Sequence, residues 1–63
     1  MTVKELYEAC LNIRNNTWVN LIRANENADG MYMEDLLKCY GDCKIKWFEF
    51  YKNMNNMDIG LWQ

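Results

Sequence analysis

The sequence contains no histidine, no serine and no proline. Without histidine, the chain lacks the commonest general base and the commonest metal ligand of proteins. Without serine, it lacks the nucleophile of the serine hydrolases. Its glycines, Gly30, Gly41 and Gly60, are too widely spaced to form a glycine-rich phosphate-binding loop. Because these are groups on which many enzymes depend, we expect a protein without catalytic activity.

Long apolar runs are also missing, since no stretch approaches the roughly 18 apolar residues that mark a transmembrane helix. Residues 1–8 carry three charges and no apolar run, which argues against a secretory signal peptide. The cysteines are Cys10, Cys39 and Cys43, and an odd number of them without a secretion signal favours reduced thiols. We therefore expect a soluble cytoplasmic protein that has no membrane partner.

A large excess of charge of either sign is lacking as well. Seven basic and nine acidic residues give a net charge of −2. A nucleic-acid-binding domain usually carries a clear basic excess, and an acidic mimic of DNA would need a much larger negative charge. We do not expect nucleic acid to be the sole partner. Lys44, Lys46 and Lys52, interleaved with aromatic residues, leave weak nucleic-acid binding as an alternative.

Aromatic residues, in contrast, are abundant. Among 63 residues there are three tryptophans, four tyrosines and two phenylalanines, far more than a disordered segment would hold. The length suffices for a single domain, residues 1–63, which no linker, repeat or low-complexity segment divides. At this size, folding removes only about 60% of the chain's surface from water, so we expect a domain of marginal stability.

The first residues have the pattern of a capped helix. Thr2 and Glu5 match a capping box, in which each side chain accepts a hydrogen bond from the other residue's backbone amide. Apolar residues then recur at helical spacing, which predicts a helix over residues 3–14. Asn15 and Asn16 end this helix because asparagine competes for backbone hydrogen bonds.

Farther along the chain, runs of β-branched and aromatic residues alternate with turn residues. Asp29 and Gly30 are typical of a type I′ turn between the first two strands. We expect strands over residues 17–23, 31–33, 44–51 and 57–62, and a second helix over residues 34–40. The predicted fold is α+β: a small antiparallel sheet of three to four strands, with an N-terminal helix and a second short helix.

Two segments have part of the pattern of a metal site. Cys39 and Cys43 have a spacing that zinc sites use, and Cys10 would be a third ligand, but no histidine exists to complete the set. Residues 25–30 match the first half of a calcium-binding loop, but Leu36 occupies the position of its bidentate carboxylate. A core cysteine and two polar turns explain the same residues, so we expect no metal and no other cofactor.

Aromatic and aliphatic residues alternate in the predicted strands, and alternate residues of a strand face opposite sides of the sheet. One set is expected to face the helices: Val19, Leu21, Phe48, Phe50, Ile59 and Leu61. The opposite side then holds Trp18, Ile22, Ile45, Trp47, Tyr51 and Trp62. In a two-layer domain of this size nothing remains to cover that side, and exposed patches rich in tryptophan and tyrosine mark interaction sites.

The predicted partner-binding residues are therefore Trp18, Ile22, Trp47, Tyr51 and Trp62. The alternative is that Trp18 and Trp47 belong to the core. A β-bulge or a different strand register would move Trp47 to the inside of the sheet.

The chain resembles the short open reading frames of phages and mobile elements of low-GC Gram-positive bacteria. The resemblance rests on the opening Met-Thr-Val-Lys-Glu-Leu-Tyr, on Glu-Asp-Leu-Leu-Lys-Cys-Tyr-Gly-Asp in the middle, and on the charged strand hairpin after it. It implies a stoichiometric binder in the host cytosol, such as an anti-CRISPR or other anti-defence inhibitor that blocks a host defence protein. A homodimeric structural or regulatory module is the second hypothesis.

Overall fold

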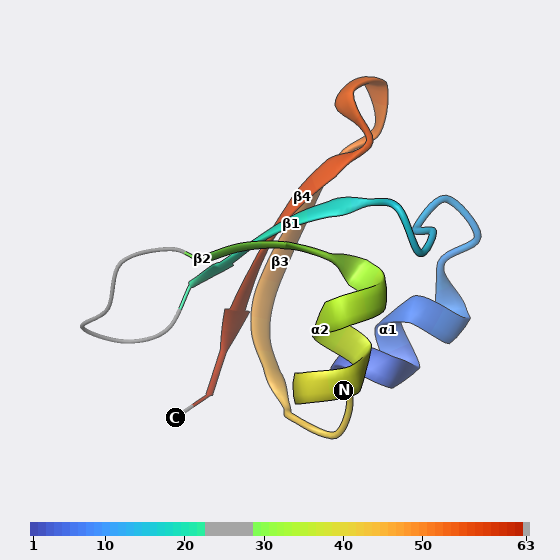
Figure 1. The fold of residues 1–63 in the computed structure, drawn as a ribbon. Coiled ribbons are helices and arrows are strands. Elements are labelled where there is room, and N and C mark those ends of the chain that lie inside the picture. Colours follow the sequence, from blue (N-terminus) through green and yellow to red (C-terminus); the bar gives the residue numbers. More distant parts are fainter. Residues whose placement is uncertain (23–28, 63) are drawn as a thin grey trace.

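A computed structural model of the chain describes residues 1–22 and 29–62. Two helices and four strands follow one another along the chain (Figure 1). In order they are α1 (Val3–Ala9), β1 (Trp18–Ile22), β2 (Asp29–Tyr32), α2 (Met33–Tyr40), β3 (Ile45–Tyr51), the short 3-10 helix η1 (Lys52–Met54) and β4 (Asn56–Leu61). The α+β class, the N-terminal helix and the second short helix are thus confirmed.

The four strands form one mixed sheet in the order β2-β1-β4-β3. The outer pairs, β1 with β2 and β3 with β4, are antiparallel, as expected for hairpins. The central strands β1 and β4 are parallel, which differs from the wholly antiparallel sheet that we expected. The difference arises because parallel neighbours need a long crossover, and β2, α2 and β3 together provide one between β1 and β4.

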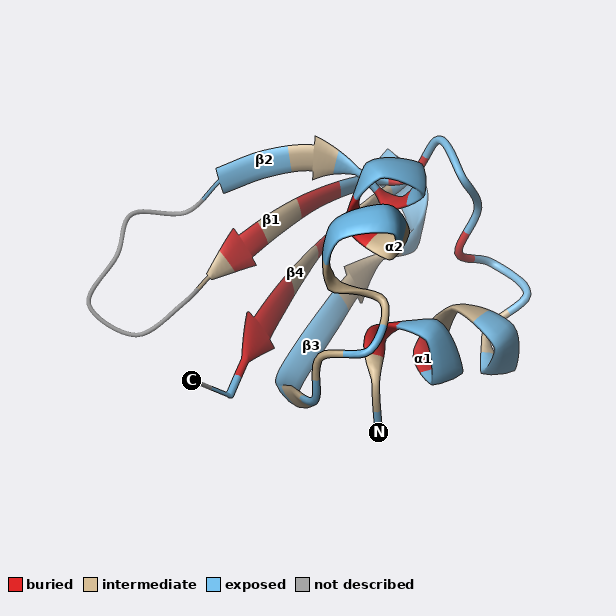
Figure 2. Ribbon diagram, turned by 60° about the horizontal axis from the view of Figure 1, so that its bottom comes forward, coloured by how far each residue is buried: buried red, intermediate tan, exposed pale blue. Residues whose placement is uncertain are grey.

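Both helices pack on the same side of the sheet and enclose a single core. Within the sheet, Figure 2 shows the buried residues in β1 and β4, the two central strands, and further buried residues lie in α1 and α2. The buried hydrophobic residues are Val3, Leu6, Ile13, Val19, Leu21, Met33, Leu36, Met57, Ile59 and Leu61. Each such side chain stabilises the fold by about 1.5–3 kcal/mol relative to an exposed one. No described helix is long and apolar enough to cross a membrane.

The capping box at the start of α1 is formed as predicted. The Thr2 amide donates to Glu5 Oε1 over 2.8 Å, and the Glu5 amide donates to Thr2 Oγ1 over 3.1 Å. The helix ends at Ala9, however, and does not extend to residue 14, because Cys10 adopts an extended backbone. Ile13 still reaches the core from the loop, so its helical spacing reflects burial and not a continued helix.

The loop after α1 is held by a buried threonine. Thr17 Oγ1 accepts from the Arg14 amide and donates to Asn55 Oδ1, each over 2.9 Å. Asn55 follows η1 and has a positive φ of 48°, a conformation that asparagine tolerates better than most residues. The Trp18 amide in turn donates to the Asn55 carbonyl over 3.1 Å. These bonds attach the start of β1 to the turn between β3 and β4.

The first hairpin departs from the sequence prediction. Asp29 and Gly30 do not form the expected turn, because they belong to β2 and pair with Leu21 and Asn20. Met33 begins α2 and does not end a strand. Residues 25–28, which include most of the half-matched calcium loop, lie outside the described residues. The remaining predicted strands agree with β1, β3 and β4 to within a residue at the ends that the structure describes.

Candidate functional site

We call the side of the sheet opposite α1 and α2 the open face. Val19 and Leu21 of β1 and Met57 and Ile59 of β4 are buried on the helix side, so the residues between them point the other way. The strand register arranges the open face in three rows across the sheet. The rows are Tyr32, Trp18, Asn56 and Tyr51; then Gly30, Asn20, Asp58 and Glu49; then Ile22, Gly60 and Trp47.

Two tryptophans of the open face each lie against a glycine of a neighbouring strand. A Cβ atom added at Gly30 would meet Trp18 Cζ2 at 2.2 Å, and one added at Gly60 would meet Trp47 Nε1 at 2.2 Å. Trp18 also packs edge-on against Tyr32, with ring centroids 5.1 Å apart and an interplanar angle of 87°. The glycines provide the space in which the indoles rest on the sheet, so both rings have a defined position without being in the core.

Between the two tryptophans lies a row of hydrogen-bonded polar groups. Asn20 Nδ2 donates to Asp58 Oδ1 over 3.0 Å, and the Tyr51 hydroxyl donates to Asp58 Oδ2 over 3.0 Å. Trp18 Nε1 donates to Asn20 Oδ1 over a longer 3.3 Å. The bonds connect three strands across the open face. They hold the Asp58 carboxylate in a fixed orientation at the centre of the face.

The charge on the open face affects the titration of Tyr51. Its hydrogen bond to Asp58 raises the pKa of the Tyr51 hydroxyl, because the bond is lost when the tyrosine ionises. Partial removal from water and the negative charges of Asp58 and Glu49 raise this pKa further. The centre of the open face therefore favours positive charge over negative charge.

The predicted binding residues have the following places. Trp18, Ile22, Trp47 and Tyr51 lie together on the open face. Trp62 follows the last residue of β4 and is exposed, with Lys46 Nζ 5.1 Å from the centroid of its ring. The positions of Trp18, Ile22, Trp47 and Tyr51 agree with the period-two interpretation.

Ile45 does not belong to the open face, contrary to the sequence prediction. A β-bulge shifts the register of β3 between Ile45 and Trp47. Because the bulge adds a residue on one strand only, Ile45 pairs with Leu61 and packs against the core, while Trp47 pairs with Gly60. Phe48 faces the helix side in register with Ile59, yet 44% of its surface is exposed because it lies on an edge strand.

Several open-face residues were not anticipated from the sequence. Tyr32 lies in the predicted strand 31–33, but the sequence pattern did not assign that strand to either side of the sheet. Asn20, Asp58 and Glu49 alternate with apolar residues, so their side of the sheet could have been inferred from the period of two. Their mutual hydrogen bonding could not, because Asn20 and Asp58 are 38 positions apart in the sequence.

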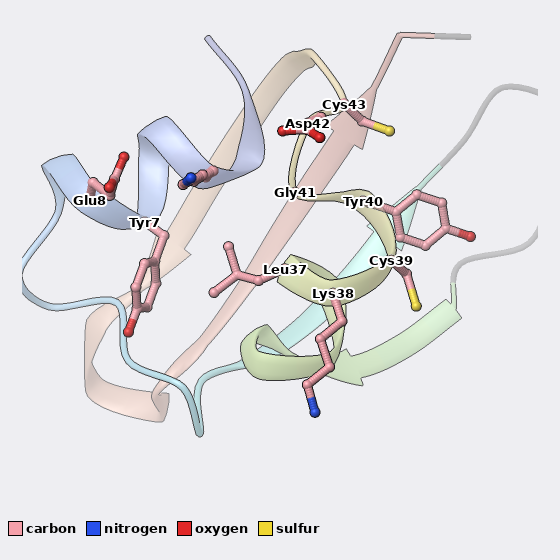
Figure 3. A pocket seen from close by; sticks show the side chains of 10 residues that line it. Tyr7, Glu8, Leu37, Lys38, Cys39, Tyr40, Gly41, Asp42 and Cys43 are labelled. Atoms are coloured by element: carbon pink, nitrogen blue, oxygen red, sulfur yellow. The ribbon is translucent and has the colours of Figure 1, made fainter.

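A second candidate is a hollow of about 460 Å³ beside α1 and the end of α2. Its lining includes Tyr7, Glu8 and residues 37–43 (Figure 3). The thiols of Cys39 and Cys43 point away from Tyr7 and Glu8 in Figure 3, so the reactive groups do not converge. Cys10, Cys39 and Cys43 are not joined by disulfides. Over the described ranges, no three histidine, cysteine or acidic residues are grouped as metal ligands would be.

Comparison with known proteins gives no relative: no family model, no curated protein and no solved structure matches the chain. Function must therefore be inferred from the geometry of this molecule.

Proposed function

We propose that this chain is a non-catalytic protein-binding module whose contact surface is the open face together with Trp62. The observation that carries the proposal is the exposure of the three tryptophans, which is 38% for Trp18, 41% for Trp47 and 60% for Trp62. Tryptophan is enriched among the residues that dominate binding energy at protein interfaces. Rings that are held in place yet accessible to solvent lose little conformational freedom when a partner covers them.

The chemistry of the open face favours protein over nucleic acid as the partner. Glu49 and Asp58 occupy its centre, where they would repel phosphate groups. The ammonium group of Lys46 lies over the ring of Trp62 and away from this acidic centre in the strand register. Repulsion between these carboxylates and the phosphates would thus oppose the stacking of bases on the tryptophans.

The narrower proposal is an inhibitor of phage type that blocks a host defence protein, such as a CRISPR nuclease, by stoichiometric binding in the host cytosol. It is supported by the resemblance to short phage and mobile-element reading frames and by the small size of the domain. A homodimeric module is the alternative, since a second copy would also cover exposed tryptophans. Sedimentation over a range of protein concentrations distinguishes the alternative from the main proposal.

The proposal is tested by capture from a lysate of a Gram-positive bacterium, with the tagged chain as bait and mass spectrometry as the readout. The variants Trp18→Ala and Trp47→Ala alter the open face. Leu11→Ala and Met54→Ala remove exposed apolar side chains from the loop after α1 and from η1, and serve as matched controls. We expect a protein that the wild type and both controls retain and that both tryptophan variants lose.

Equal retention by the tryptophan variants and the controls would contradict the proposal, provided that thermal melts show all four variants to be folded. The inhibitor hypothesis has its own readout. Adding the purified chain to a CRISPR nuclease should reduce DNA cleavage in proportion to the amount of chain, and the tryptophan variants should reduce it less.

A further inference from the structure

Two carboxylates face each other across neighbouring strands in the middle of the open face. Glu49 of β3 is the register partner of Asp58 of β4, and residues paired in this way have Cβ atoms about 4.5–5.5 Å apart. Like charges at such positions repel each other. No basic side chain of the described residues forms an ion pair with either carboxylate. We call Glu49 and Asp58 the acidic pair.

Hydrogen bonds hold the Asp58 carboxylate of the acidic pair in a fixed orientation. Asp58 accepts from Asn20 and from Tyr51, one bond at each carboxylate oxygen. Each of these oxygens can accept a further bond, because a carboxylate has about four lone-pair sites. The negative charge at the centre of the open face is therefore held in position and remains accessible.

Aromatic rings lie on both sides of the row that contains the acidic pair. Trp47 lies one row away on the strand of Glu49, about 7 Å along it. Trp18 lies in the row on the other side, one strand away from Asp58. The chain itself shows how such a ring holds a cation, since Lys46 Nζ is 5.1 Å from the ring centroid of Trp62, within the range of a cation–π contact.

We infer that the open face recognises an arginine-bearing extended segment of the partner protein, with one guanidinium over the acidic pair and against the ring of Trp47. A guanidinium fits both neighbours because it is planar, stacks on aromatic rings and donates several hydrogen bonds to carboxylates. The inference rests on the proposed function and adds the chemical class of the partner's contact.

The acidic pair also argues against a second copy of the chain as the occupant. In a two-fold dimer the same patch lies on both sides of the interface. An axis through the middle of the open face would therefore bring two acidic pairs together, with four carboxylates and no described cation between them. An arginine from a different protein relieves the repulsion that a second copy would increase.

A pair of peptides tests the inference. One is a short blocked peptide with arginine at alternate positions, and the other has citrulline in place of each arginine, which keeps the shape and removes the charge. Amide and indole signals of the isotope-labelled chain are followed by NMR during titration. We expect the arginine peptide to shift the signals of Trp47, Glu49 and Asp58, and the citrulline peptide to leave them in place.

Charge-neutralising variants complete the experiment. Glu49→Gln and Asp58→Asn should each weaken binding of the arginine peptide about two- to fivefold, the range for a solvent-accessible ion pair. Glu34→Gln and Asp35→Asn, which change exposed acidic residues of α2, are the matched controls and should leave the affinity unchanged. Because Glu49 is exposed, Glu49→Gln remains informative even if Asp58→Asn disturbs the fold.

Equal binding of the two peptides, or no shift on the open face with either, would overturn the inference. The inference would also be overturned if the α2 controls weakened binding of the arginine peptide as much as Glu49→Gln and Asp58→Asn do. These outcomes are separable from a failure of the proposed function, because lysate capture by the wild type and its loss in Trp18→Ala and Trp47→Ala do not depend on the charge of the partner.

Discussion

Trp47 lies against Gly60 so closely that any side chain at position 60 would displace it. A Cβ atom at Gly60 would meet three atoms of the indole within 2.7 Å. Because β4 is a central strand, the backbone at Gly60 has little freedom to move away. The absence of a side chain at Gly60 therefore determines where an aromatic ring of the candidate binding surface lies.

The first prediction is that Gly60→Ala moves the Trp47 ring and destabilises the fold by about 1–3 kcal/mol, as overpacking does. Urea denaturation measures the loss, and the indole NMR signal of Trp47 reports the displacement. In a Trp47→Ala background the same change should cost little stability or even stabilise the fold. Without the indole in the way, alanine in a strand is more stable than glycine by roughly 0.5–1 kcal/mol. An equal cost in both backgrounds would show that the indole is not what the new methyl group meets.

The second prediction concerns the hydrogen bond between Tyr51 and Asp58. Asp58→Asn should lower the pKa of Tyr51 towards its usual value, because both the hydrogen bond to a carboxylate and a nearby negative charge are lost. In the wild type, the pKa of Tyr51 is higher in the folded than in the unfolded state. The stabilisation of the fold by the protonated Tyr51 hydroxyl is therefore complete below the usual tyrosine pKa. It disappears as the pH rises through the pKa of Tyr51 in the folded state.

Titration of the tyrosine ring signals by NMR identifies Tyr51 by comparison with Tyr51→Phe. Denaturation at increasing alkaline pH should show the wild type losing more stability than Tyr51→Phe, which has no hydroxyl to ionise. An unchanged Tyr51 pKa in Asp58→Asn would mean that the hydrogen bond is not formed in solution.

The third prediction concerns the capping box. Hydrogen bonds from the backbone and side chain of Thr2 lower the pKa of Glu5. Since this pKa is depressed on folding, the stabilisation is present above the usual glutamate pKa and is lost as the pH falls through the folded value. Glu5→Gln should make stability less dependent on pH in the acidic range, which urea denaturation at several pH values measures.

Thr2→Ala should cost about 1 kcal/mol at neutral pH, and Thr2→Ser, which keeps the hydroxyl, should cost less.

Local patterns in the sequence predicted more of this molecule than long-range ones. The capping box needs only Thr2 and Glu5, three positions apart, and it is formed as expected. Ile13 is buried by tertiary packing of the loop after α1. Because its spacing from the apolar residues of α1 is also helical, the predicted helix was too long. The parallel pairing of β1 with β4 could not be predicted, because alternation shows which side a residue faces and not the direction of the strand.

In the candidate site, too, local patterns were predicted from the sequence and long-range relationships were not. Period-two alternation placed Trp18 and Trp47 on the side without helices, as the structure has them. It failed for Ile45, where the bulge in β3 interrupts the alternation. The acidic pair could not be predicted without the register between β3 and β4. That register depends on where the intervening turn begins and ends.

The fourth prediction contrasts two adjacent residues at the end of β4. Leu61 is buried in the core, whereas Trp62 is exposed and lies beneath the Lys46 ammonium group. Leu61→Ala should cost about 2–5 kcal/mol of stability, as large-to-small core substitutions do, and this is a large part of the roughly 5–15 kcal/mol of a typical domain. Trp62→Ala should melt close to the wild type and lose partner capture, because an exposed ring contributes more to an interface than to the core. Thermal melts and lysate capture are measured on both variants, with Met54→Ala as the exposed control. A strong loss of stability in Trp62→Ala would assign this ring to the core and would remove it from the contact surface.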